Sequence, residues 1–386
     1  MIIHIVPTGN FGNRALQYFA AAGIQSHAPG AKIQNIELPE AGINQPAPAP
    51  DPQNSVATGR GWLDIAGFAD CLARGVIETI RIEDYPYHLQ NFPPRAAARN
   101  LIPPLPGGQN ATGFGPNDLV CSIRGAEILR AIHPDYLVLP PAYYQMLAGR
   151  TGKNLVFFGQ IGDDPYSASL RRAFPAAAFI QSGGLEHDFE TLRRSVHIAP
   201  SVSTFAWLAA WLSHANKIYL PVCGFFNPVQ HAEQLFLPLD DESYEYTLFP
   251  YAKATDVWAH TARFFLQQEV LAQGMRPVMP DELLQIITRM RAFHPRLPYA
   301  AGFDPDFYLT QYADVRAAVA DGSQPSALHH YVHAGFAEKR LPLALDSGFY
   351  ASTYPDAALA IAEGHYADPL HHYQAVGFAK GYRPLP

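Results

Sequence analysis

The stretch HIAPSVSTFAWLAAWLSHANKIYLPV, residues 197–222, contains the pattern that decides the fold. Residues 197–199 and 217–222 are largely apolar runs of strand length, and residues 204–215 between them form a run of helix length. A strand, a helix and a second strand in this order predict a parallel sheet with helices on both faces. The same alternation continues upstream, where we expect strands at 118–123, 154–158 and 178–180 and helices at 142–148, 170–174 and 189–195.

A second unit of this kind opens the chain. Residues 2–6 predict a buried strand, residues 8–13 (TGNFGN) a turn, and residues 14–22 a helix. Gly9 and Gly12 would let the backbone come close to a ligand, and the helix start would offer free N–H groups to an anion. The turn could equally serve only to connect strand and helix. Its spacing is not G-x-G-x-x-G, so a dinucleotide-binding fingerprint is not supported.

Two Pro-rich stretches divide the first part of the chain. Residues 40–55 predict a surface loop, and residues 92–116 predict a linker between domains. A chain of 386 residues exceeds the size at which one core keeps growing, so several domains are expected. We expect an N-terminal Rossmann-like domain at 1–116, a second Rossmann-like domain at 117–254, a helical connector at 255–300 and a helical repeat module at 301–386.

The C-terminal module is a duplication. The sequence from Phe303 (FDPDFYLTQYADV) aligns with that from Leu345 (LDSGFYASTYPDA) at a constant offset of 42 residues, which indicates two copies of one small unit. Adjacent histidines in both copies, 329–330 and 371–372, point in different directions on a helix, and this favours a structural role over a chelate. The unit resembles the FDxxYYLxxNPDV…NPLxHYxxxGxxEGRxP repeat attached to bacterial surface-polysaccharide enzymes and exported proteins. Its tyrosines are expected in the core, with glycan binding or oligomer contacts as alternatives.

The composition excludes several classes of function. A formal net charge of -7 argues against a protein that binds nucleic acid through the phosphate backbone. Three distant cysteines without CxxC spacing indicate neither a disulfide framework nor a zinc site, and a reducing compartment is expected. The N-terminus lacks the features of a signal peptide, and no apolar run reaches the roughly 20 residues of a membrane span. We expect a cytoplasmic protein whose association with the inner membrane, if any, is peripheral.

An arginine follows the expected strand 118–123. In the sequence VCSIRGAE, residues 120–127, Arg124 would lie at the C-terminal edge of a parallel strand. Open α/β sheets bind ligands at this edge, and the planar guanidinium suits a diphosphate. The alternative is a surface arginine paired with Glu127 or Asp118.

Polar residues also stand at the starts of two expected helices. Asp188 precedes one of them, and Ser203 and Thr204 precede the apolar helix of the opening stretch. Ser203 or Thr204 could cap that helix, while hydroxyls and free N–H groups at its start suit a phosphate or a ribose. Trp207 and Trp211 share one helical face and are expected in the core.

Four motifs resemble those of bacterial α-1,2-fucosyltransferases. GNFGNRALQYFAA at 9–21 resembles the family's G-x-x-G-N-Q-x-x-Q-Y opening, and SVSTFAWLAAWL at 201–212, followed by KIYLPV, resembles its SSFSWWGAWL segment and the strand after it. CSIRGAEI at 121–128 occupies the place of HVRRGDY, and LPPAYYQML at 139–147 the place of LPxxYY. The motifs follow in the same order over residues 1 to about 230.

The resemblance implies a GT-B fold, in which two Rossmann-like domains enclose a cleft, and an inverting glycosyltransferase that needs no metal or other cofactor. It implies a nucleotide-sugar donor, a GDP-sugar and fucose before others, and a glycan or lipid-linked oligosaccharide acceptor in bacterial surface or exopolysaccharide synthesis. By motif position, Arg124 would be the catalytic residue that holds the donor diphosphate. The positions that would line the donor site with it are Gly12, Asn13, Asp188, Ser203, Thr204 and Phe205.

The chain departs from the family at several positions. Cys121 and Ile123 stand where the family has a histidine and its first arginine, and residues 126–127 replace its aspartate step, so another hexose or deoxysugar donor is compatible. A non-catalytic glycan- or nucleotide-binding protein and a pyruvyl or Kdo transferase on a similar scaffold remain alternatives. The catalytic base is not assigned, and the candidates by position alone are His133, Asp135, Glu186 and His187, each of which could equally be an ordinary surface or hydrogen-bonded residue.

Overall fold

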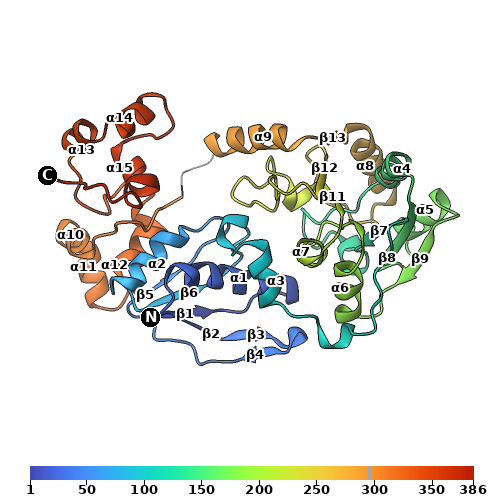
Figure 1. Ribbon diagram of the computed structural model, residues 1–386, viewed down its shortest axis with the longest axis horizontal. Coiled ribbons are helices and arrows are strands. Elements are labelled where there is room, and N and C mark those ends of the chain that lie inside the picture. The colour runs from blue at the N-terminus through green and yellow to red at the C-terminus, as the bar shows by residue number, and fades with distance from the viewer. Residues whose placement is uncertain (294–296) are drawn as a thin grey trace.

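The computed structural model describes residues 1–293 and 297–386. Two α/β halves lie side by side along the longest axis of the molecule, and a helical module lies at the far end of the N-terminal half (Figure 1). The predicted fold class, α/β with two Rossmann-like domains and a C-terminal helical module, is confirmed. Among the described residues, no helix is both long and apolar enough to cross a bilayer.

The N-terminal half is built on a four-stranded parallel sheet in the order β2-β1-β6-β5. Its strands are β1 (Ile2–Ile5), β2 (Lys32–Gln34), β5 (Ser55–Ala57) and β6 (Thr79–Ile82), and its helices are α1 (Phe11–His27), α2 (Ile65–Ala73) and α3 (Arg95–Leu101). After β2 comes an antiparallel hairpin of β3 (Ile36–Leu38) and β4 (Ile43–Gln45), joined by the 3-10 turn η1 (Pro39–Ala41). The prediction of a loop from residue 40 onward is wrong over η1 and β4, because pairing with β3 overrides the Pro-rich composition.

The C-terminal half contains a seven-stranded sheet in the order β13-β12-β11-β10-β7-β8-β9. Its strands are β7 (Asp118–Ile123), β8 (Asn154–Gly159), β9 (Ala178–Gln181), β10 (His197–Ala199), β11 (Lys217–Val222), β12 (Tyr244–Leu248) and β13 (Arg276–Val278). The helices α4 (Pro141–Thr151), α5 (Pro165–Ala173), α6 (Leu185–Arg193) and α7 (Thr204–Leu212) connect them. β13 is antiparallel to β12, and the other pairs are parallel. The central strands β7, β10 and β11 are buried almost throughout, which explains their continuous apolar sequences.

The chain returns toward the N-terminal half through α8 (Thr261–Gly274), β13 and α9 (Pro280–Phe293). The predicted helical connector is therefore interrupted by a strand, since residues 276–278 pair with β12. Helix α9 extends from the C-terminal half toward the N-terminal half (Figure 1), and its Arg291 lies 2.6 Å from Nε2 of the buried His88. Burial, with a contribution from Arg291, lowers the pKa of His88 to about 3, so this imidazole stays neutral.

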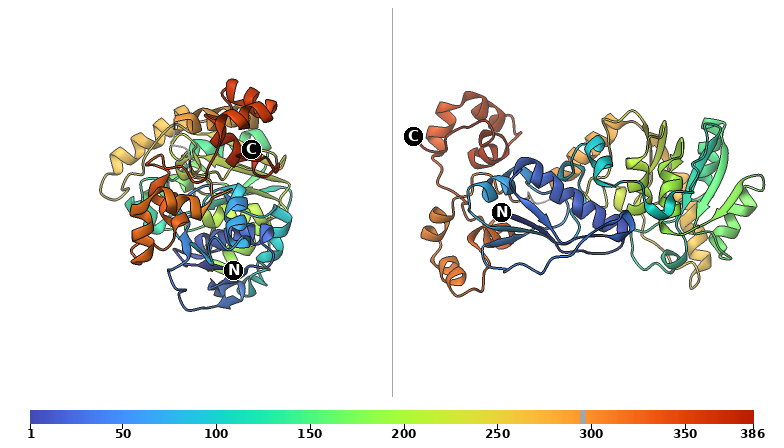
Figure 2. Two further views of the ribbon diagram at one scale, coloured as in Figure 1. Left: turned by 90° about the vertical axis from the view of Figure 1, so that its left-hand side faces the viewer. Right: turned by 60° about the horizontal axis from the view of Figure 1, so that its bottom comes forward.

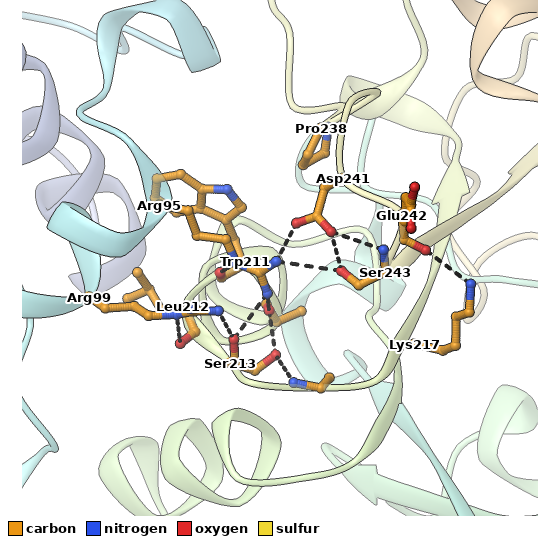
Figure 3. Close-up of polar contacts among 12 residues, drawn as sticks. Arg95, Arg99, Trp211, Leu212, Ser213, Lys217, Pro238, Asp241, Glu242 and Ser243 are labelled. Atoms are coloured by element: carbon orange, nitrogen blue, oxygen red, sulfur yellow. Dashed lines mark hydrogen bonds and ion pairs between the residues drawn. The ribbon is translucent and has the colours of Figure 1, made fainter.

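Helix α3 fastens the two halves together, although its residues lie in the stretch predicted as a linker. Arg95 and Arg99 donate hydrogen bonds to carbonyls at the end of α7, and Arg95 also pairs with Asp241 of the C-terminal half (Figure 3). The last carbonyls of a helix lack partners within the helix and carry partial negative charge, so these two guanidinium groups satisfy them. The linker prediction is wrong here because RAAARNL, residues 95–101, is a good helix-forming run between prolines.

The two repeats have the same order of elements. The first contains α10 (Pro305–Gln311), α11 (Ala313–Ala320) and α12 (Ala327–His330), and the second contains α13 (Ser347–Thr353), α14 (Pro355–Ala362) and α15 (Pro369–His372). The hydroxyl of Tyr308 lies 3.0 Å from Nδ1 of His330, and the equivalent Tyr350 lies 2.9 Å from Nδ1 of His372. These four side chains are buried, so one histidine of each adjacent pair packs in its repeat.

The first repeat covers the outer edge of the N-terminal sheet. β5 is the terminal strand of that sheet, and α12 packs beside it. The hydroxyl of Ser326 donates to the carbonyl of Ser55 at 2.7 Å, and Nε2 of His333 lies 2.9 Å from the carbonyl of Ala57. The second repeat has a small core of its own around Tyr350 and stands apart from the sheet (Figure 2).

Candidate functional site

A cavity of about 360 Å³ lies where the two halves meet. The first turn of α1 and the turn η1 line it from the N-terminal half, and the ends of β7 and β8 with the starts of α6 and α7 line it from the C-terminal half. All the residues predicted for the site line this cavity, namely Gly12, Asn13, Arg124, Asp188, Ser203, Thr204 and Phe205. The structure thus brings together residues from three distant parts of the sequence, and their binding of a nucleotide stays a prediction.

Sheet topology explains why the C-terminal residues meet. Strands β10, β7 and β8 are parallel neighbours, so their C-terminal ends lie at the same edge of the sheet. Arg124 directly follows β7, Gln160 directly follows β8, and Ser201 comes two residues after β10; all three line the cavity. This edge is where open α/β sheets hold their ligands.

Three helices begin at the cavity without a side-chain cap. The residues before their first turns are Asn10 for α1, Gly184 for α6 and Ser203 for α7. Glycine has no side chain to cap α6, and the side chains of Asn10 and Ser203 make no capping hydrogen bond. Asp64 caps α2 and Asp164 caps α5, whereas α3, α4 and α8 also begin without a side-chain cap. Uncapped N–H groups and the positive ends of helix dipoles favour an anion. The prediction that Ser203 or Thr204 caps α7 is therefore wrong, and the free helix start faces the cavity instead.

Gly12 allows the starts of α1 and α7 to touch. A Cβ atom at this position would lie 3.0 Å from the backbone nitrogen of Phe205 and 3.1 Å from Oγ1 of Thr204, closer than side chains normally pack. The hydroxyl of Thr204 uses this approach to donate a 2.8 Å hydrogen bond to Oδ1 of Asn13. The two halves thus meet at the floor of the site through main chain and two short polar side chains.

Arg124 is held flat at the cavity wall. Its Cζ lies 4.4 Å from the centre of the Tyr136 ring, and its Nη2 donates to Oε1 of Glu127 at 3.2 Å. Of the two partners considered for Arg124, Glu127 is therefore confirmed, whereas Asp118 accepts a hydrogen bond from Asn154. The side chain of Arg124 is 19% exposed, so the guanidinium is accessible from the cavity while the ring and the carboxylate orient it.

Asp188 supports the site rather than presenting a free carboxylate. Its Oδ2 accepts from the hydroxyl of Ser182 at 2.5 Å, and its Oδ1 accepts from the backbone N–H of Gly183 at 2.8 Å. These bonds hold the turn that leads into α6. Phe205 packs edge-on against Phe189 with ring centres 5.5 Å apart, which fixes the first turn of α7.

The candidate bases named from sequence position are not among the described residues that line the cavity. Asp135 is buried, accepts from Nζ of Lys253 at 2.8 Å and lies 2.9 Å from Nε2 of His231. Burial acts to raise the pKa of Asp135, but the contacts with Lys253 and His231 outweigh it and hold the pKa below its ordinary value. His133 lies 3.7 Å from the same carboxylate.

The other two candidates are engaged near α6. Glu186 accepts a hydrogen bond from the backbone N–H of Gly107, and Nδ1 of His187 lies 3.5 Å from Oδ1 of Asp188. Sequence position near a strand end or helix start did not locate a base, because partners on other elements decide where these side chains lie.

Sequence reasoning missed several residues that line the cavity. Tyr136 and Gln160 come from loops after β7 and β8, and Glu40 comes from the turn η1. Glu40 pairs with Arg14 of the first turn of α1, Oε1 to Nη2, at 2.5 Å. No local signal marks Glu40, since it lies in a Pro-rich stretch and reaches the cavity through the β3–β4 hairpin.

Metal-ligating side-chain types and thiols both occur in the described part of the chain. No three His, Cys, Asp or Glu side chains of the described residues gather as metal ligands. Cys71, Cys121 and Cys223 are free and buried, and burial raises the pKa of the Cys71 and Cys223 thiols to about 12.

Comparisons with known proteins found similarity at the level of the backbone. No family model matches the sequence, and no curated protein matches it. A mutant of Arabidopsis thaliana FUT1 in complex with GDP aligns with 57% of this chain and 70% of its own, at 8% identity and a TM-score of 0.37. The heptosyltransferase WaaC of E. coli with ADP aligns with 69% of this chain and 99% of its own, at 12% identity and a TM-score of 0.35. A glycosyl transferase of family 9 from Veillonella parvula aligns with 76% and 97%, at 9% identity and a TM-score of 0.35.

Proposed function

We propose that this chain is an inverting glycosyltransferase that moves a sugar from a nucleotide-diphosphate donor to a glycan acceptor without a metal ion. The observation that carries the proposal is the convergence of Arg124 with the uncapped starts of α6 and α7 on one cavity between the two halves. This is an anion site at the ligand-binding edge of a parallel sheet, and it faces a second wall that can hold another substrate.

The chemistry explains why such a site suits this reaction. When a sugar–diphosphate bond breaks, the bonding electrons pass to the diphosphate, and negative charge develops on its oxygens. Preorganised donors aimed at that charge lower the barrier by several kcal/mol. In the proposed site the planar fork of Arg124 and the free N–H groups at the start of α7 supply these donors, while Tyr136 and Glu127 fix the guanidinium.

The donor would occupy the C-terminal half and the acceptor the N-terminal half. Ser201 and Ser203 offer hydroxyls beside the anion site for a ribose or a phosphate, while the Thr204 hydroxyl, which donates to Asn13, can accept from a ribose. The resemblance to α-1,2-fucosyltransferases favours a GDP-sugar, and the changes at Cys121 and Ile123 leave room for a sugar other than fucose. The acceptor class would be a glycan or lipid-linked oligosaccharide of a bacterial polysaccharide.

One observation favours a second candidate, a binding protein without catalysis. Glu127 already pairs with Arg124, and this carboxylate competes with a diphosphate for the guanidinium. In that case the cavity would hold a nucleotide or glycan and leave it unchanged.

A binding and turnover experiment separates the two. The melting temperature is measured with GDP, UDP, ADP, dTDP and CMP, because a ligand that binds the folded state raises it. Hydrolysis of GDP-fucose, GDP-mannose, UDP-glucose and dTDP-rhamnose is then followed with the wild type, Arg124→Ala and Arg150→Ala. Arg150 is the matched control, since it forms a surface pair with Glu245 away from the cavity.

We expect one nucleotide to stabilise the protein and its sugar to be hydrolysed. Arg124→Ala should lower that turnover by about 10²–10³-fold, the usual loss for one donor to developing charge, while Arg150→Ala leaves it unchanged. Binding without hydrolysis would support the non-catalytic alternative, and the absence of any nucleotide effect would remove the transferase and leave glycan binding as the only form of that alternative.

A further inference from the structure

Two side chains of the N-terminal half form an ion pair at the cavity wall. Glu40 stands on η1 and Arg14 in the first turn of α1, and Nη2 of Arg14 lies 2.5 Å from Oε1 of Glu40. Their side chains are 21% and 18% exposed, and both residues line the cavity. The pair is thus largely removed from solvent and faces the same space as Arg124.

The pair is incomplete in its hydrogen bonding. Oε2 of Glu40 and Nε of Arg14 are both buried, and neither has a hydrogen-bond partner. Buried polar atoms normally have partners, and leaving one unpaired is destabilising, the more so for a charged group. Oε2 of Glu40 can accept a hydrogen bond and Nε of Arg14 can donate one, and a hydroxyl group can serve as the partner of both. The free hydrogen-bonding capacity of these two atoms therefore matches a sugar hydroxyl better than a phosphate, which cannot donate to a carboxylate.

The other carboxylates of the cavity are less suited to take up a proton. Both oxygens of Asp188 accept hydrogen bonds within the turn before α6. Glu127 stands on the C-terminal half and is paired with Arg124, on the side where the leaving group would lie. Glu40 comes from the other half of the molecule, where the acceptor would enter.

We propose that Glu40 is the general base of the transfer, an inference that rests on the proposed glycosyltransferase function. As the acceptor oxygen forms its bond to the anomeric carbon, its proton passes to the carboxylate of Glu40, whose buried Oε2 turns toward the cavity to receive it. The bond from the anomeric carbon to the diphosphate oxygen breaks, and its electrons remain on the diphosphate held by Arg124. Base and leaving group on opposite sides of the anomeric carbon give inversion. Arg14 is a positioning residue, which holds Oε1 so that Oε2 takes the proton.

The test uses water as the acceptor, so that no glycan needs to be known. Hydrolysis of the nucleotide sugar selected from GDP-fucose, GDP-mannose, UDP-glucose and dTDP-rhamnose is measured for the full chain, Glu40→Gln, Glu40→Asp and the matched control Glu37→Gln. Glu37 is three residues away on β3 and is not among the residues that line the described cavity. The dissociation constant of the free nucleotide and the melting temperature are measured for each variant.

We expect Glu40→Gln to lower turnover by about 10²–10⁴-fold, the usual contribution of a general base, with the nucleotide dissociation constant within about twofold of wild type. Glu40→Asp keeps a proton acceptor and should retain more activity than Glu40→Gln. The wild-type rate should fall at low pH as the base becomes protonated, and this limb should be missing in Glu40→Gln. Arg14→Gln, measured in the same way, frees Oε1 and should lower turnover while the nucleotide dissociation constant and the low-pH limb are kept, a combination that a purely structural role would not produce.

Two results would overturn the assignment. If Glu40→Gln hydrolyses the donor within about threefold of the wild-type rate, the base lies elsewhere. If Glu40→Gln loses both turnover and nucleotide binding, the role of Glu40 is structural. Failure of the proposed function gives a different result. If the wild type binds none of the nucleotides, both proposals are wrong. If the wild type binds a nucleotide, Arg124→Ala loses turnover and Glu40→Gln stays active, only the assignment of Glu40 as the base is wrong.

Discussion

The hydroxyl of Thr204 donates a 2.8 Å hydrogen bond to the side-chain oxygen of Asn13, although 191 positions separate the two residues. The bond joins the first turn of α7 to the first turn of α1, and so joins the two halves at the floor of the cavity. A change in this contact is therefore expected to alter both the stability of the molecule and the shape of the cavity.

Thr204→Val tests the contact with little change in side-chain volume. Loss of one hydrogen bond should lower the free energy of unfolding by about 1 kcal/mol, measured by urea denaturation. Thr288→Val on the exposed face of α9 is the control, because its hydroxyl bonds only within its own helix, to the carbonyl of Leu284. Equal stability of wild type and Thr204→Val would show that the bond does not hold the halves together.

Gly12→Ala tests the close approach of the two helices. The added Cβ would meet the backbone of Phe205 at 3.0 Å, so α1 must move away from α7, and overpacking of this kind costs about 1–3 kcal/mol. Gly149→Ala in α4 is the matched control, since its Cβ would meet nothing within 4 Å and alanine favours a helix. The control should be neutral or more stable than wild type in the same denaturation experiment; a Gly12→Ala variant as stable as the control would contradict the packing described.

Arg95→Met tests the clasp between α3 and α7. The variant leaves Asp241 without its partner and removes donors from the carbonyls that end α7, which should cost about 2–3 kcal/mol. Arg150→Met, which breaks the more exposed pair with Glu245, should cost less than about 1 kcal/mol. Calorimetry should also show a broader or divided transition for Arg95→Met, and an unchanged single transition at wild-type temperature is the contrary outcome.

His231 should make stability depend on pH above the ordinary histidine pKa of 6.5. Contact with Glu233 raises the pKa of His231 above 6.5, burial opposes this, and Asp135 adds to the increase. Because the folded state binds the proton more tightly, the stabilisation is complete below the ordinary pKa and is lost as pH rises through the raised value. The difference in unfolding free energy between wild type and His231→Gln should be larger at pH 6 than at pH 8.5. The exposed His365→Gln serves as the control, and a difference that does not change with pH would refute the prediction.

The two repeats should differ in their importance for folding. Removal of residues 344–386 takes away a repeat with its own core, so the rest should stay folded and soluble with a modest loss of stability. Removal of both repeats from residue 302 exposes the edge of β5, and an open sheet edge promotes association. Size-exclusion chromatography should show a monomeric form of the first variant and aggregates of the second; a monodisperse second variant would mean that the edge needs no cover.

Local sequence predicted what depends on local physics. The apolar runs around residues 197–222 predict β10, α7 and β11, and the constant offset of 42 residues predicts the two repeats. The residues of the site came from three motifs, and parallel topology explains why they meet at one edge. The residues named from the motifs therefore line one cavity, and their roles in binding and catalysis stay predictions.

The missed features depend on contacts between distant segments. The three-residue strands β3, β4 and β13 have no period long enough to recognise and exist because a partner strand pairs with them. Tyr136 became part of the site through its contact with Arg124, and Glu40 through its contact with Arg14. Neither contact has a signature in the linear sequence, because each joins a loop residue to a different element.

The first repeat, which covers β5, is synthesised long after the sheet that it protects. Ser55 and the Ser326 that bonds to it are 271 positions apart, so a ribosome completes the N-terminal sheet long before it makes the segment that shields it. At typical rates of synthesis this interval is on the order of 10–50 s. During that time the edge of β5 is unprotected, so nascent chains on one polysome can pair through it unless a chaperone shields it.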